Sequence, residues 1–170
     1  MEKLLIFFII LASSMEMWAK DTGETLQERA YRNIQYAMDN AVHDASLHID
    51  KKLLGDGTYD FKEAEALSAA QETLYRNLPL KGKNDLTPTH TYYFSEPIQI
   101  VDIVFVDDDY IYPLTGSEVS FPFNYKYENP TKNIEFERPI FGQSVVLVIQ
   151  TTIVSEDSPS YFIAIEEYKS

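Results

Sequence analysis

The hydrophobic pattern of the chain changes character along its length. Over Thr22–Leu54, small and apolar residues recur three or four positions apart, which is typical of one face of a helix. A second helix is predicted over Phe61–Leu78, with Asp60 as its N-cap and Pro79 as its stop. Beyond Thr91 the apolar residues alternate with polar ones and are mostly β-branched or aromatic, which is typical of strands. We therefore predict an α+β fold with a helical first half and an antiparallel β second half.

The second half is predicted to form a set of short strands. Their predicted ranges are Thr91–Phe94, Ile98–Val106, Ser120–Glu128, Ile134–Arg138, Ser144–Val154 and Tyr161–Tyr168. Short connections between consecutive strands favour antiparallel pairing. The continuous apolar run Val145–Ile149 predicts a central strand, whereas the polar segment Lys81–His90 predicts a linker.

An unbroken apolar run lies close to the N-terminus. It comprises Leu4, Leu5, Ile6, Phe7, Phe8, Ile9, Ile10 and Leu11. Two interpretations are open. As the core of a signal peptide, the run has the usual length and is followed by small residues suited to cleavage. As a membrane anchor, the segment extends over roughly 16 residues, just short of a typical span.

These observations divide the chain into three regions. Residues 1–19 are predicted to be a membrane anchor or signal segment, residues 20–80 a helical region and residues 81–170 an antiparallel β domain. Both interpretations of the first region predict export. The protein would be a single-pass membrane protein with an extracellular domain, or a secreted or periplasmic protein if the segment is cleaved.

Composition limits the classes of function. The net charge of −13 argues against nucleic acid as a partner, because a phosphate backbone requires a basic face. The chain has no cysteine, which excludes disulfides, thiolate metal sites and cysteine nucleophiles. No catalytic residue and no cofactor site is predicted, and we expect the protein not to be an enzyme.

Acidic residues offer only weak candidates for a metal site. Asp107, Asp108 and Asp109 follow a predicted strand and could hold calcium, although such a run is more often a solvated turn. The segment around Gly57 has the spacing of the second half of an EF-hand loop. Its first two ligand positions would fall on Lys52 and Leu54, which cannot bind calcium, so the sequence predicts no calcium site there.

One predicted strand has an aromatic face. Phe121, Phe123, Tyr125 and Tyr127 alternate with smaller or polar residues. The face could recognise a protein or a glycan, or it could reflect the ordinary preference of strands for aromatic residues. The first reading leads to a secreted or periplasmic binding module with a cleaved signal peptide and an aromatic recognition face.

The helical region offers a different interaction surface. Its predicted stripe includes Ala30, Ile34, Ala37, Ala41 and Ala45. Small residues allow another helix to approach closely, so the stripe suits packing between helices. The alternative is that the helix lies on the sheet of its own domain.

The layout of the whole chain resembles a known group of proteins. The segments that carry the resemblance are Met1–Leu11, Ala30–Asp50, Gly57–Leu80 and Phe141–Val154. Together they resemble the Tad-type (type IVb) pilin-like proteins, or pseudopilins, of Gram-positive bacteria. The resemblance implies a membrane-anchored subunit that acts in a surface appendage or in secretion or conjugation. It also implies that the partners are other pilin-like subunits and that assembly occurs through helix packing.

Overall fold

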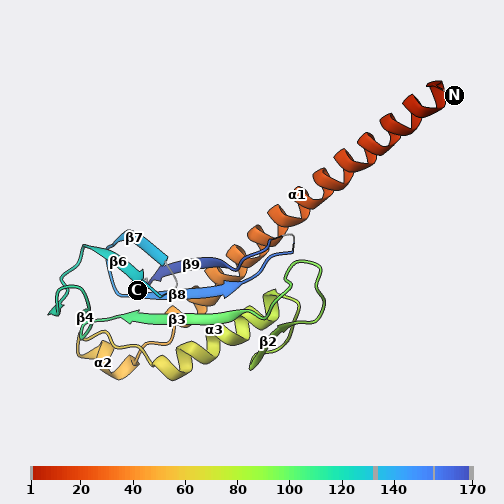
Figure 1. Ribbon diagram of the computed structural model, residues 1–170. Helices are drawn as coiled ribbons and strands as arrows, with labels where there is room; N and C mark the ends of the chain where they lie inside the picture. The colour runs from red at the N-terminus through yellow and green to blue at the C-terminus, as the bar shows by residue number, and fades with distance from the viewer. Residues whose placement is uncertain (1, 132–133, 155, 169–170) are drawn as a thin grey trace.

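The first half of the chain is dominated by one long helix. The computed structural model describes residues 2–131, 134–154 and 156–168, and of residues 2–5 it describes the backbone only. Helix α1 spans Glu2–Ser46 without interruption, and its 45 residues correspond to a length of roughly 68 Å. Its N-terminal part projects away from the rest of the molecule (Figure 1). The apolar run and the alanine-bearing stripe therefore belong to a single rod.

Helix α1 ends earlier than its hydrophobic pattern predicts. The predicted end at Leu54 is wrong, because the helix stops at Ser46. Ile49 instead forms an antiparallel bridge with Phe61, and the amide of Asp50 donates to the carbonyl of residue 60 at 2.9 Å. Pairing between these two segments replaces the helical hydrogen bonds that the spacing alone would favour.

Two shorter helices follow. Helix α2 spans Lys51–Gly55 and helix α3 spans Glu63–Asn77. The predicted capping by Asp60 is wrong, since Lys62 occupies the N-cap position of α3 and makes no side-chain capping bond. At the other end, Leu78 is extended, with φ −119° and ψ 152°. The residue before a proline is pushed out of the helical region, so Pro79 sets this end as predicted.

The strands form four antiparallel groups among the described residues. Their bounds are β1 Leu80–Gly82, β2 Asp85–Pro88, β3 Gln99–Val106, β4 Ile111–Tyr112, β5 Ser117–Glu118, β6 Phe123–Asn129, β7 Ile134–Ile140, β8 Ser144–Thr151 and β9 Ser160–Glu167. Strands β3, β8 and β9 form a sheet in the order β3-β8-β9, and β1-β2, β4-β5 and β6-β7 are separate pairs. The prediction of an α+β fold with antiparallel strands is confirmed.

Several predicted strands differ in detail. The segment predicted as a linker forms the hairpin β1–β2, in which Leu80 pairs with Pro88. The strand predicted over Thr91–Phe94 is reduced to one bridge between Phe94 and Ile153. Strand β6 begins three residues later than predicted, after a cis peptide bond at Pro122. The sequence pattern also missed the two-residue strands β4 and β5.

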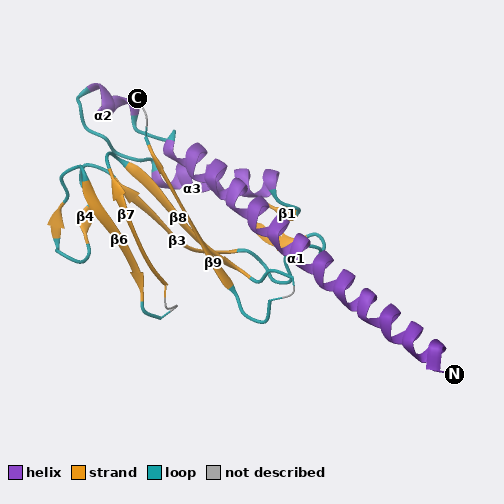
Figure 2. Ribbon diagram, turned by 90° about the horizontal axis from the view of Figure 1, so that it is seen from above, coloured by secondary structure: helices purple, strands orange, loops and turns teal. Residues whose placement is uncertain are grey.

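The molecule has three layers built around β8. Figure 2 shows α1 and α3 on one side of the sheet and the β6–β7 pair on the other. Val145, Leu147 and Ile149 of β8 pack with the helices, whereas Val146 and Val148 pack with β6 and β7. All five side chains are fully buried, and each contributes about 1.5–3 kcal/mol relative to exposure. The prediction of a central strand here is confirmed by the order β3-β8-β9.

The helical and β regions share this core. One hydrophobic cluster contains Ala41 of α1, Leu74 of α3 and Leu147 of β8. At residue 80 the chain therefore changes from mainly helical to mainly β structure, while one hydrophobic core continues through both regions. The N-terminal residues up to about 29 lie outside the core, because burial on α1 begins at Ala30.

Candidate functional site

The projecting part of α1 carries a series of exposed apolar side chains. Its large apolar side chains are Ile6, Phe7, Phe8, Ile9, Ile10, Leu11, Met15, Met17 and Trp18, and they are between 44% and 77% exposed. The side chains of Leu4 and Leu5, predicted as part of the same run, lie outside the described residues. An apolar surface of this kind on one helix marks a site of contact with another apolar phase or partner.

Polar contacts fix the point at which α1 leaves the domain. The carboxylate of Glu156, in the loop between β8 and β9, accepts hydrogen bonds from Gln27 at 2.8 Å, from Tyr31 at 2.6 Å and from Ser160 at 2.7 Å. Burial by itself would raise the pKa of Glu156, but these hydrogen bonds outweigh it and lower the pKa below its usual range. We call these four residues the exit clamp. No sequence signal indicates it, because Glu156 lies 125 residues from Tyr31.

The alanine stripe lies inside the domain. Its predicted residues Ala30, Ile34, Ala37, Ala41 and Ala45 are all 0% exposed. They belong to the core cluster that also contains Ala66 and Ala70 of α3. Small residues on both helices allow α1 and α3 to pack closely. The stripe therefore acts in helix packing within this chain, and a helix of another subunit cannot reach it in the folded domain.

The aromatic strand also faces inward. Tyr125 and Tyr127 are buried in the hydrophobic cluster between β6–β7 and the central sheet. Phe121 and Phe123 pack against this cluster. Burial raises the pKa of Tyr125, and it raises the pKa of the neighbouring Tyr110 to about 12. Two of the four aromatic side chains are thus buried and the other two are partly buried against the same cluster, which is what β propensity with core packing produces.

The acidic run after β3 has a structural role. One oxygen of Asp108 accepts from the backbone N–H of Tyr59 at 2.7 Å, and the other accepts from Gln143 at 2.8 Å. Asp107 is half-buried and Asp109 is exposed. The described residues contain no group of three His, Cys, Asp or Glu side chains placed to hold a metal ion. Asp108 ties the loop to two other segments of the chain.

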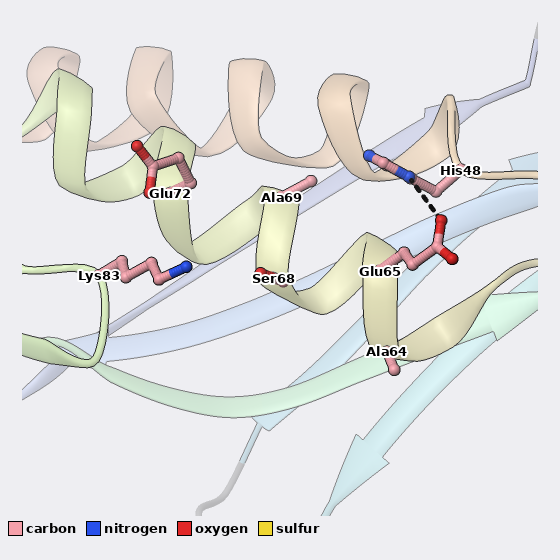
Figure 3. Close-up of a pocket in the computed structure, with 7 residues that line it drawn as sticks. All are labelled: His48, Ala64, Glu65, Ser68, Ala69, Glu72 and Lys83. Atoms are coloured by element: carbon pink, nitrogen blue, oxygen red, sulfur yellow. Dashed lines mark ion pairs between the residues drawn. The ribbon is translucent and has the colours of Figure 1, made fainter.

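A shallow hollow lies beside α3 at the end of α1. His48, Glu65, Ser68 and Lys83 line it together with Ala64, Ala69 and Glu72, around a volume of about 490 Å³ (Figure 3). Nδ1 of His48 lies 3.6 Å from a carboxylate oxygen of Glu65. Ser68 makes no hydrogen bond to His48, so this pair does not activate a serine nucleophile.

Comparisons with known proteins give no assignment. No protein family, curated protein or solved structure matches this chain. In the part of the chain that the structure describes, no helix is both long enough and apolar enough to cross a membrane.

Proposed function

We propose that this protein is a pilin-like subunit that is held at the cell membrane by the N-terminal end of α1 and displays its acidic domain outside the cell. The observation that carries the proposal is the projection of the apolar run from the domain. Ile6–Leu11 make no contact with the core, and exposing so many large apolar side chains to water is unfavourable. Burial in a bilayer or among neighbouring helices would remove this cost.

The structure of α1 also supports a role in assembly. The exit clamp and the buried stripe hold the C-terminal part of α1 rigidly against the domain. Since the stripe is occupied by α3 and the sheet, contacts with other subunits fall to the projecting part before the exit clamp, residues 6–26. Assembly through helix packing is therefore proposed for this projecting part only.

The proposal is tested by the state of the protein in the cells that produce it. We expect the chain to be recovered in the membrane fraction with its N-terminal residues intact. A soluble chain that begins near Met15 would contradict the proposal, because the apolar run would then have been removed as a signal peptide. That result would support the secreted binding module instead.

A pair of variants makes the test specific to the apolar run. Ile9→Asp places a charge within the run, and Asn33→Asp places the same charge on an exposed position of the domain part of α1. An aspartate within a membrane segment costs about 2.5–3.5 kcal/mol, which corresponds to roughly 100-fold weaker partitioning. Membrane association should therefore fall strongly for Ile9→Asp and stay unchanged for Asn33→Asp. The single tryptophan, Trp18, gives a fluorescence signal for the same comparison on zwitterionic vesicles.

A further inference from the structure

Strand β3 forms an open edge of the central sheet. Its only strand neighbour among the described residues is β8, and its sequence is QIVDIVFV. Natural edge strands are usually protected by short length, proline, lysine or a bulge. Strand β3 has an irregular register between Ile100 and Asp102, but its second half, Ile103–Val106, is regular and has no charged residue. This second half lacks the usual protection.

The open edge is bounded at both ends. The amide of Ile98 donates to the carbonyl of Leu86 in β2 at 3.0 Å, and the amide of Asp108 donates to the carbonyl of Tyr59 at 3.2 Å. Between these two bonds, backbone hydrogen bonding of β3 in the described structure is confined to its ladder with β8. The backbone groups of β3 that point away from β8 are thus available to pair with another strand.

Helix α3 extends the helical layer past this edge. A groove of about 500 Å³ is lined on one side by α3 and on the other by β3 and the residues after it. The lining residues are Glu63, Ala64, Leu67, Ile103, Val104, Phe105 and Tyr110. Figure 1 shows α3 running beside β3, whereas α1 lies over β8 and β9. A strand added at β3 would therefore enter this groove, with apolar side chains of α3 covering one of its faces.

The charges at the groove identify the kind of occupant. The groove is lined by Glu63 and by no lysine or arginine. Asp107, the residue that follows β3, is outside this lining and adds a second carboxylate at the end of the strand. Burial raises the pKa of Asp107, and repulsion from Asp60 and Asp109 adds to this effect, although a backbone hydrogen bond from Phe61 opposes it. A cation placed here would relieve the repulsion.

A second copy of the chain fits these charges poorly. The chain carries a net charge of −13, and its own β3 has no basic residue to place beside Asp107. Like charges brought together at an interface are unfavourable. The favoured occupant is therefore a segment of a different protein.

We propose that β3 accepts an extended segment of another protein as a fourth strand of the sheet. The segment would have apolar side chains at alternate positions, facing α3, and a lysine or arginine beside Asp107. Main-chain hydrogen bonds would provide affinity, and the groove and the acidic end would provide specificity. The inference is independent of membrane attachment, because it uses only residues of the folded domain.

The test uses the full chain and a synthetic peptide of alternating valine and threonine with a lysine at each end. A second peptide replaces both lysines with glutamate. We expect the lysine peptide to protect amides of Gln99–Val106 from hydrogen exchange and to bind at least about tenfold more tightly than the glutamate peptide. Absence of binding at millimolar peptide, equal binding of both peptides, or binding without protection of β3 would each overturn the proposal.

Variants locate the binding to the groove. Leu67→Lys places a long charged side chain into the groove, and Leu47→Lys introduces the same residue at a position that is 56% exposed and outside the groove. Only Leu67→Lys should weaken binding of the lysine peptide, by about tenfold or more. If that variant does not fold, Ala64→Lys makes the same test from an exposed position of the groove. Protection of β3 that rises with protein concentration without peptide would identify a second copy as the occupant and overturn the choice of partner.

Discussion

Replacing Ala41 by leucine tests whether the alanine stripe packs within the chain. Ala41 is 0% exposed and lies in the cluster that holds Ala66 and Ala70 of α3. If room were present, the three added carbons would stabilise the fold by about 2 kcal/mol. The close approach of two alanine-bearing helices leaves no such room, and overpacking of a dense core costs about 1–3 kcal/mol. We therefore expect Ala41→Leu to lower the free energy of unfolding by about 1–3 kcal/mol.

Urea denaturation of the full chain measures this change, and the melting temperature should fall by about 2–4 °C for each kcal/mol lost. The matched control is Ala19→Leu, the same substitution at an exposed position of the same helix. Its effect should stay within about 0.5 kcal/mol. If Ala41→Leu has the stability of the parent chain but blocks association with other subunits, the stripe faces a partner and the packing described above is incorrect.

Three further predictions concern the core, the exit clamp and the half-buried Tyr110. Leu147→Ala should cost about 2–5 kcal/mol in urea unfolding, because it empties a fully buried site in β8, whereas Leu114→Ala, at 52% exposure, should change little. Glu156→Gln should increase amide exchange and proteolysis near residue 31, with little change in β8. Folding lowers the pKa of Glu156, so the ionised carboxylate stabilises the folded chain fully at pH values above the carboxyl pKa of the unfolded chain. Acidification through the folded pKa should therefore loosen the clamp in the parent chain. The clamp of Glu156→Gln should not respond to this change in pH. In an ultraviolet titration, Tyr110→Phe should remove a phenol whose pKa is raised to about 12, and an unchanged titration curve would contradict the partial burial of this residue.

The sequence predicts the features that depend on local periodicity. The three- and four-residue spacing identifies the buried face of α1, and Pro79 sets the end of α3 through a steric effect on its neighbour. The apolar run Val145–Ile149 identifies the central strand, since only a strand covered on both faces tolerates such a run. These features require no knowledge of distant residues.

Features that depend on distant contacts could not be predicted in the same way. The spacing of Ile49 continues the helical stripe, yet its pairing with Phe61 draws it out of the helix. The turn residues in 81–90 are equally compatible with a linker and with a hairpin, and only the pairing of strands across the turn distinguishes the two. The exit clamp likewise joins residues more than a hundred positions apart.

The candidate functional surfaces also separate into properties set by the local sequence and properties set by distant contacts. The sequence by itself determined that the N-terminus is apolar, that one stripe of the long helix is small and that one strand is aromatic. Only the tertiary structure decided which of these faces are buried: the alanine stripe and the aromatic strand pack inward, and the apolar run projects. It also decided that β3 is an edge, because strand order depends on pairing between segments and not on the composition of any one of them.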